Sequence, residues 1–345
     1  MQNIRIDLSS DTATKPTEAM REFMSKAEVG DEQIKEDPSV NRLVEMVCEL
    51  LGKEDAIFLP SGTMCNAIAY RVHCRPGDEI ILDQTSHPWR FETGGAAALS
   101  GALIYPVNGV RGIFTADQVK KAIRPKNNHA PRSRVVSIEQ TTNLGGGAVW
   151  PLQTINEVYA VADQHGLAKH MDGARLLNAV EASGVSAESF AKNTDSVWID
   201  FSKGLGAPVG AALAGSKEFI TEAWRWKHQF GGAMRQAGII AAAGIYALQH
   251  HVDRLAEDHA NAQILARGLA DIDGIKVEPV ETNLVFFDLS DLNISSSTFN
   301  CMLMENGIRL KSADDFRMRA VTHLDVSQSQ IQETLSIIRG VVKKI

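Results

Sequence analysis

The chain has 345 residues, of which 44% are hydrophobic and 22% charged, and its formal net charge at pH 7 is −7. This length allows one large and one smaller domain, and the composition is that of an ordinary globular protein. The negative charge and the scattered basic residues argue against nucleic-acid binding, and no apolar run approaches the about 20 residues of a membrane span. The opening residues also lack the apolar core of a signal peptide, so we expect a cytoplasmic protein with a small-molecule substrate.

The first clear helix follows Asp37, where an N-cap residue and a proline precede apolar residues with helical spacing up to Leu51. Short apolar runs bounded by turn residues then predict seven strands that are buried on both faces. They lie at 56–60, 79–83, 102–106, 134–138, 168–172, 197–201 and 210–215. Helical stretches such as 61–74 and 152–166 separate them. This alternation predicts an α/β domain with a mostly parallel sheet flanked by helices.

The C-terminal part has a different pattern. We expect the large domain to span residues 1–245 and a small α+β domain to span residues 246–345. A long helix from about Arg235 to Asp271 leads into two strand signals, "IKVEP" and "NLVFFDL", and an amphipathic helix begins after Ser327. The four cysteines have no metal-binding spacing, so we interpret them as structural thiols and expect no metal site.

One lysine, Lys203, lies within the apolar and glycine-rich stretch "SVWIDFSKGLGAPVGAALAG". A buried, unpaired ammonium group is costly because it loses its hydration. A Schiff base with an aldehyde cofactor would account for the lysine, and the neighbouring glycines would let such a cofactor approach the backbone. A lysine in an ordinary surface loop is the alternative.

Three other features bear on this choice. The Ser-Gly-Thr sequence at 61–63 follows a strand and begins a helix, where free N–H groups attract a phosphate. His87 follows the next strand and precedes a diglycine. Asp172 ends a strand, with Arg175 three residues later, at the sheet edge where α/β proteins bind ligands. Each feature alone can be a helix cap or a core group, but the combination matches what pyridoxal phosphate requires.

Over nearly its whole length the chain resembles the threonine aldolases, which belong to the aminotransferase-like, fold type I pyridoxal phosphate enzymes. The matching motifs are "DLSSDTAT", "EDPSVNRLVE", "FLPSGTMCN", "GGAAALSG", "HMDGARLLNA", "SKGLGAPVGAALAGS", "GGAMRQAGIIAAAGIYAL" and "RAVTHLDVS". The resemblance implies a lyase that cleaves L-threonine, L-allo-threonine or a related β-hydroxy-α-amino acid to glycine and an aldehyde. It also implies a homo-oligomer, a dimer of dimers.

The resemblance further implies residue roles. Lys203 would form the internal aldimine, Asp172 would hold the pyridine nitrogen protonated, and His87 would stack on the cofactor ring. The other implied cofactor-binding residues are Ser61, Gly62, Thr63, Arg175, Ser202 and Arg235, of which Arg235 would reach the phosphate from a neighbouring subunit. The implied substrate-binding residues are Ser10, Thr142, Arg175 and Arg319, and arginine suits this task because its planar fork binds a carboxylate bidentately.

Several positions depart from the family pattern. Thr142 replaces a histidine thought to contact the substrate hydroxyl, and His228 replaces a phosphate-contacting lysine whose place the adjacent Lys227 could take by reach. Changes near the active-site loop and the N-terminal motif are Ile34 for tyrosine, Lys35 for glycine and Ser9 for arginine. We therefore expect retained pyridoxal chemistry with an altered side-chain preference. Two alternatives stay open: β-elimination or dehydration of a related amino acid, and a non-catalytic pyridoxal-binding protein.

Overall fold

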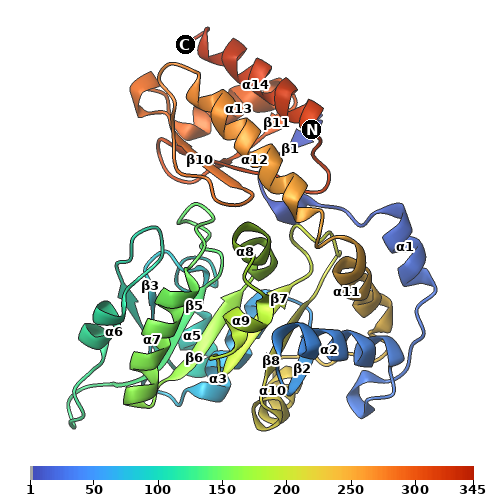
Figure 1. Ribbon diagram of the computed structural model, residues 1–345, viewed down its shortest axis with the longest axis vertical. Coiled ribbons are helices and arrows are strands. Elements are labelled where there is room, and N and C mark those ends of the chain that lie inside the picture. Colours follow the sequence, from blue (N-terminus) through green and yellow to red (C-terminus); the bar gives the residue numbers. More distant parts are fainter. Residues whose placement is uncertain (1–2) are drawn as a thin grey trace.

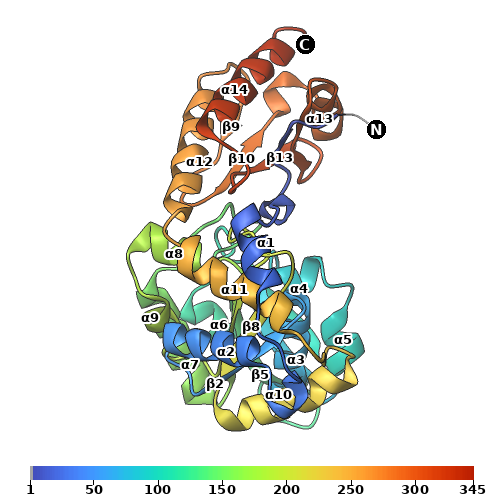
Figure 2. The same ribbon diagram turned by 90° about the vertical axis from the view of Figure 1, so that its right-hand side faces the viewer.

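The computed structural model describes residues 3–345, which form two lobes (Figure 1). The large lobe contains the central sheet and its helices, and the smaller lobe contains the C-terminal part of the chain. The N-terminal strand β1 lies at the smaller lobe, and the chain then runs to the large lobe through α1, as both views show (Figures 1 and 2). The start of the chain therefore bridges the two lobes.

The large lobe is built on a seven-stranded sheet in the order β2-β8-β7-β6-β5-β3-β4. Its strands are β2 (Asp55–Leu59), β3 (Asp78–Asp83), β4 (Leu103–Val107), β5 (Arg132–Glu139), β6 (Ala168–Gly173), β7 (Ser196–Asp200) and β8 (Ala211–Gly215). Only β8 is antiparallel to its neighbours β2 and β7, and the other adjacent pairs are parallel. The predicted α/β fold with a mostly parallel seven-stranded sheet is confirmed.

Helices cover both faces of this sheet, so its strands are apolar on both sides. In β2, Phe58 packs into the core of one face and Ile57 into the core of the other. The first face is covered by α2 (Pro38–Leu51), α6 (Ala116–Ala122), α7 (Leu152–His165), α8 (Leu176–Ser183), α9 (Ala187–Ala191) and α11 (Gly238–His250). The opposite face is covered by α3 (Gly62–His73), α5 (Gly95–Ser100) and α10 (Lys217–Gln229). The expectation of full burial is wrong for β4, which is the edge strand and leaves Leu103 50% exposed.

The predicted long helix from Arg235 to Asp271 is also wrong, because the chain breaks between α11 and α12 (Leu255–Ala270). The intervening turn is fixed by His251, whose buried ring nitrogen Nδ1 bonds the carbonyl oxygen of Leu205 at 2.7 Å. The two helices also have different packing partners. α11 packs on α1 (Glu18–Ser25) and α2, whereas α12 packs on α14 (Gln328–Val342). Each lobe therefore holds one half of the predicted helix.

The smaller lobe has an antiparallel sheet in the order β12-β13-β10-β9. Its strands are β9 (Lys276–Val277), β10 (Leu284–Asp288), β12 (Lys311–Ser312) and β13 (Arg317–Val321). β1 (Ile6–Asp7) pairs in parallel with β11 (Ile308–Arg309), and α12, α13 (Ser296–Glu305) and α14 complete the lobe. α14 begins after its N-cap Ser327, as predicted. Ile6 and Leu8 lie in the core of this lobe, and the domain boundary near residue 245 stays a prediction.

The remaining short elements are α4 (His87–Arg90) and the 3-10 turns η1 (Asp11–Ala13), η2 (Glu32–Ile34) and η3 (Ser290–Leu292). Within residues 3–345, no helix has both the length and the apolar character needed to cross a membrane. The six mutually parallel strands of the large sheet end at one edge, beside the smaller lobe. Loops that follow these strands meet the N-terminal segment and β13 there, and this edge holds the candidate site.

Candidate active site

A cavity of about 360 Å³ lies at this edge, and it is lined by all the predicted site residues except Thr142 and Arg235. The large lobe contributes residues that follow β2, β3, β6 and β7, the N-terminal segment contributes Ser10, and β13 contributes Arg319. The predicted residues brought together here are Ser10, Ser61, Gly62, Thr63, His87, Asp172, Arg175, Ser202, Lys203 and Arg319. Residues chosen from separate motifs therefore share one cavity.

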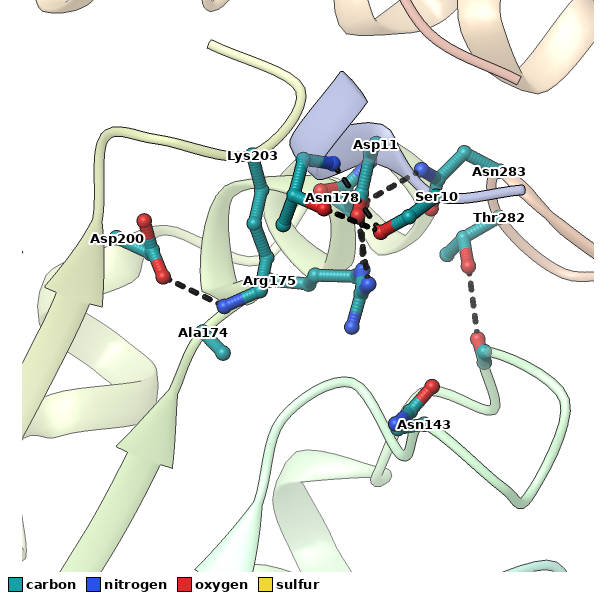
Figure 3. Close-up of polar contacts among 12 residues, drawn as sticks. Ser10, Asp11, Asn143, Ala174, Arg175, Asn178, Asp200, Lys203, Thr282 and Asn283 are labelled. Carbon is teal, nitrogen blue, oxygen red and sulfur yellow. Dashed lines mark hydrogen bonds and ion pairs between the residues drawn. The ribbon is translucent and has the colours of Figure 1, made fainter. Parts of the chain in front are cut away.

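Lys203 lies in the loop between β7 and β8, and its side chain is 20% exposed. Its Nζ donates a hydrogen bond to Asp200 Oδ2 at 2.5 Å (Figure 3). The other carboxylate oxygen of Asp200 accepts bonds from both the amide N–H and the hydroxyl of Ser202, each at 2.7 Å. The ammonium group is thus compensated by a buried carboxylate at the end of β7.

Asp172, at the end of β6, is linked to His87 through two intermediate side chains. Asn66 donates to Asp172 Oδ2 at 2.9 Å and to Glu92 Oε1 at 2.8 Å, and the same Glu92 oxygen lies 2.8 Å from His87 Nδ1. Burial raises the pKa of Asp172. Burial alone would lower the pKa of His87, but the hydrogen bond with Glu92 and the charge of Asp172 raise it. The cavity floor is therefore a hydrogen-bonded set of carboxylates with one imidazole.

The N-terminus of α3 opens into the cavity. Ser61 caps this helix, because its hydroxyl accepts a bond from Met64 N–H and its carbonyl accepts one from Cys65 N–H. The amides of Gly62 and Thr63 remain in the first turn, where no intrahelical acceptor exists. A Cβ atom at Gly62 would lie 2.2 Å from the ring of Trp198, so only glycine fits here. The result is a helix N-terminus suited to an anion.

Two arginines form the wall on the side of the smaller lobe. Arg175 binds Asp11 bidentately, with Nε and Nη2 at 2.7 and 2.8 Å from the two carboxylate oxygens (Figure 3). Burial alone would raise the pKa of Asp11, but Arg175 lowers it well below its usual range. Arg319 donates only to neutral oxygens, those of Asn143 and Ser9, and its buried Nε has no partner among residues 3–345. Arg319 thus retains hydrogen-bonding capacity for a ligand.

Two predicted residues lie elsewhere. Thr142 is buried, does not line the cavity, and its hydroxyl has no partner within the described chain. The Arg235 side chain is 63% exposed and pairs with Asp31 at 2.6 Å on the surface. Their assigned roles stay predictions.

The suggestion that Lys227 replaces a phosphate-contacting lysine does not hold. Its side chain is fully buried, and its Nζ forms an ion pair with Glu32 at 2.8 Å. Glu32 also accepts a bond from the Met234 amide, which ties η2 to the segment before α11. Lys227 is therefore a structural cation of α10 and is not free to reach the cavity.

Sequence reasoning missed several lining or supporting side chains. Asp200 ends a predicted strand three residues before Lys203, so the strand-end argument that selected Asp172 could also have selected it. Asp11 follows Ser10 in a quoted motif, but nothing local indicates its pairing with Arg175. Other missed polar residues include Asn66, Glu92, Glu139, Asn143 and Lys311.

Comparisons with known proteins agree with this architecture. The family model described as "Beta-eliminating lyase" matches residues 7–292. The chain is 41% identical to the low specificity L-threonine aldolase of Escherichia coli (strain K12) over 329 residues, covering 95% of this chain and 96% of that one. It is 40% identical to low-specificity L-threonine aldolase 1 of Arabidopsis thaliana, covering 96% and 94% of the two chains.

Two solved structures share the fold. A threonine aldolase of Leishmania major superimposes with a TM-score of 0.84 at 21% identity, covering 98% of this chain and 99% of that one. A putative L-allo-threonine aldolase of Listeria monocytogenes superimposes with a TM-score of 0.81 at 21% identity, covering 99% and 97%. At this identity the superpositions concern the fold alone.

Proposed function

The chain belongs to the threonine aldolase group of the β-eliminating lyase family, and on this premise we propose that it cleaves the Cα–Cβ bond of a β-hydroxy-α-amino acid. L-threonine and L-allo-threonine are the simplest substrates, and the products are glycine and an aldehyde. The observation that carries the proposal is the shared cavity, in which Lys203, Asp172, His87 and two arginines surround one small volume.

The donor set of this cavity fits pyridoxal phosphate. The open N–H groups of Gly62 and Thr63 suit the phosphate, the Asp172 carboxylate suits a protonated pyridine nitrogen, and Lys203 suits covalent attachment. When bound, the cofactor would supply the conjugated ring that accepts the electrons of the broken bond. In the present structure the Ser202 hydroxyl donates its hydrogen bond to Asp200. To contact the phosphate as proposed, this hydroxyl must turn away from Asp200.

The protein's own groups then have defined tasks. Arg319 binds the substrate carboxylate through the Nη N–H groups that its contacts with Asn143 and Ser9 leave free, and Arg175 is held in place beside it by Asp11. Fixing the carboxylate orients the scissile bond, which can contribute several kcal/mol to catalysis. His87 is the proposed base for the β-hydroxyl proton. Because Glu92 engages Nδ1, Nε2 is the ring nitrogen left for this transfer.

The proposal is tested by spectroscopy and product analysis together. The purified protein with pyridoxal phosphate should show a visible absorption band that shifts with glycine, and L-allo-threonine should yield glycine plus acetaldehyde in equal amounts. Ammonia and a keto acid would instead identify β-elimination or dehydration. A protein that stays colourless with added pyridoxal phosphate would contradict the cofactor assignment.

We also propose a homo-oligomer in which Arg235 reaches the phosphate site of a neighbouring subunit. The support is its exposed position beside apolar side chains of the same surface, such as Ile34, which is 64% exposed. A dimer of dimers is the proposed assembly, by analogy with the family. The free state of all four cysteines supports a reducing compartment, and we propose the cytoplasm.

A further inference from the structure

The wall of the cavity on the side of the smaller lobe carries two cations that lie side by side on adjacent strands of one sheet. Lys311 of β12 and Arg319 of β13 are directly paired in register, and both line the cavity. Directly opposite residues of an antiparallel pair point to the same face, with Cβ atoms about 5 Å apart. Like charges in this arrangement are destabilising, so the pair calls for an anion between or beside the two side chains.

No carboxylate among residues 3–345 forms an ion pair with either side chain. The other two cations of the cavity are neutralised, Arg175 by Asp11 and Lys203 by Asp200. Arg319 contacts only neutral oxygens, and Lys311 forms no ion pair within residues 3–345. The Nζ of Lys311 lies 5.9 Å from the centroid of the Phe91 ring.

The carboxylates on the opposite side of the cavity are already engaged. Glu139 accepts bonds from the amides of Asn143 and His87, and Glu92 accepts from Asn66 and pairs with His87. Partial burial, together with the charge of Arg319, lowers the pKa of Lys311. Burial and the charge of Arg175 lower the pKa of Arg319 to about 10, although the charge of Asp11 acts in the opposite direction. Asp11 is itself bound bidentately by Arg175, so neither Lys311 nor Arg319 has a carboxylate partner of its own within residues 3–345.

One carboxylate of an amino-acid substrate can satisfy Arg319 but leaves Lys311 uncompensated. Lys311 is exposed and lies beside Phe91, whose ring centroid is 5.4 Å from that of His87. A substrate whose hydroxyl meets His87 can therefore direct its β-substituent toward the side of the cavity that holds Phe91 and Lys311. A second anionic group on that substituent would therefore meet Lys311.

Resting on the proposed function, we propose that Lys311 determines specificity by binding a side-chain carboxylate, and that the preferred substrates are β-hydroxy-α-amino dicarboxylates such as 3-hydroxy-L-aspartate. In this cleavage the Cα–Cβ bond breaks, the β-hydroxyl loses its proton and Cα gains one. The products are glycine and glyoxylate, which keeps the second carboxylate.

The test compares 3-hydroxy-L-aspartate with 3-hydroxy-L-asparagine, which has the same shape without the charge, and with L-threonine. The wild-type holoenzyme is expected to prefer the acid to the amide by about tenfold to a hundredfold in kcat/KM, the range of one hydrogen bond to a charged group. Lys311→Met should remove this preference and leave L-threonine within about twofold, whereas Lys311→Arg should retain it. Lys276→Met is the matched control, because Lys276 lies at the far edge of the same sheet and pairs with Asp291.

A binding measurement separates this inference from the reaction itself. L-aspartate and L-asparagine lack the β-hydroxyl, so their effect on the visible spectrum of the holoenzyme reports recognition without aldol cleavage. A preference for L-aspartate that Lys311→Met abolishes supports the inference even if L-threonine is not cleaved. Equal binding of the two, or an equal loss for all substrates including L-threonine in Lys311→Met, overturns it, since Lys311 would then serve no side-chain carboxylate.

Discussion

The charge of Lys203 is balanced within its own loop. Asp200 is buried at the end of β7 and holds both Lys203 and Ser202, so its carboxylate orders the residues on either side of the proposed covalent bond. This ion pair lowers the cost of placing a lysine in an otherwise apolar stretch, because each charged group replaces part of the hydration that the other has lost.

Replacing Lys203 should affect stability and activity in separable ways. Lys203→Ala is expected to be inactive and to lack the visible cofactor band. It should also lower the free energy of unfolding by about 1–3 kcal/mol, because Asp200 is left buried without its partner. Adding Asp200→Asn should restore much of the stability and none of the activity. Thermal unfolding and absorbance spectra check this, and wild-type turnover in Lys203→Ala would refute the assignment.

Glu139 makes stability depend on pH. Burial and the charge of Asp172 raise its pKa from 4.5 to about 7. Between these values the folded state binds more protons than the unfolded state, so the free energy of unfolding falls as pH rises. Glu139→Gln removes this dependence. Between about pH 4.5 and pH 8, the free energy of unfolding of the wild type should therefore fall by about 1–3 kcal/mol more than that of Glu139→Gln.

Urea unfolding of the cofactor-free protein at both pH values measures this change. Because glutamine accepts at one oxygen only, the variant carries a constant penalty, and the pH-dependent part of the difference is the informative quantity. A difference that is the same at both pH values would mean that Glu139 does not titrate in this range.

At the scale of elements, one buried carboxylate joins three segments. Asp37 caps α2 by accepting a bond from Val40 N–H at 3.0 Å, and its other oxygen accepts from the amides of Gly30 and Gly238 at 3.2 and 2.8 Å. It therefore sets the start of α11 as well as that of α2.

Asp37→Ala should cost more than the loss of an ordinary helix cap. Three amides, two of them buried, would lose their acceptor, so we expect about 3 kcal/mol or more. Ser216→Ala is the matched control, since Ser216 caps α10 through the Phe219 amide alone, and it should cost about 1 kcal/mol. Chemical denaturation compares the two variants, and equal losses would show that the three-way contact adds no stability.

The N-terminus of α3 gives a test of the proposed phosphate site. Gly62→Ala places a methyl group against the rigid ring of Trp198, so the first turn of α3 must shift. Overpacking of this kind costs about 1–3 kcal/mol of folding free energy. Displacing the amides that would hold the phosphate should separately weaken pyridoxal phosphate binding by about tenfold to a hundredfold, the range of one or two hydrogen bonds to a charged group. Gly95→Ala, where the new Cβ meets nothing within 4 Å, is the control. Equal affinities measured by absorbance titration would place the phosphate elsewhere.

The local sequence pattern was sufficient to predict most strands of the large lobe, because strands buried on both faces are mostly apolar runs. It also predicted where α2 and α14 begin, because Asp37 and Ser327 are typical N-cap residues. The pattern failed where tertiary packing determines the end of an element. The apolar period continues through the α11–α12 break, and the turn there is set by His251 and a distant carbonyl. Site residues that lie within sequence motifs could also be predicted from the local pattern. The residues that they bind could not be predicted, since Arg175 and Asp11 are 164 residues apart in sequence and Arg319 and Asn143 are 176 residues apart.

At the scale of the whole molecule, the cavity is closed by three parts of the chain that are distant in sequence. The large lobe supplies the floor, β12 and β13 supply one wall, and the N-terminal segment crosses between them after β1 pairs with β11. Relative movement of the lobes would therefore change the distance between Arg319 and Lys203, which belong to different lobes.

The surface around η2 and the start of α11 has the features of a contact between subunits. Ile34 and Ile239 are 64% and 49% exposed, and hydrogen bonds from residues 32 and 33 to the backbone of Met234 and Arg235 hold the two segments together. Exposed large apolar side chains on two linked segments, together with an exposed arginine, are typical of an interface between subunits.

Assembly and cofactor binding should be coupled through this surface. Ile34→Glu combined with Ile239→Glu is expected to produce a smaller assembly by light scattering, because buried like charges would face each other across this interface. If Arg235 binds the cofactor of the neighbouring subunit, this smaller assembly should lose pyridoxal phosphate affinity to at least the same extent as Arg235→Ala, which should itself keep the wild-type assembly. Adding Arg235→Ala to the double variant should then cause no further loss, since the two changes remove the same contact. A further loss in the triple variant would mean that Arg235 acts within its own subunit, and a monomeric wild type would exclude the shared site.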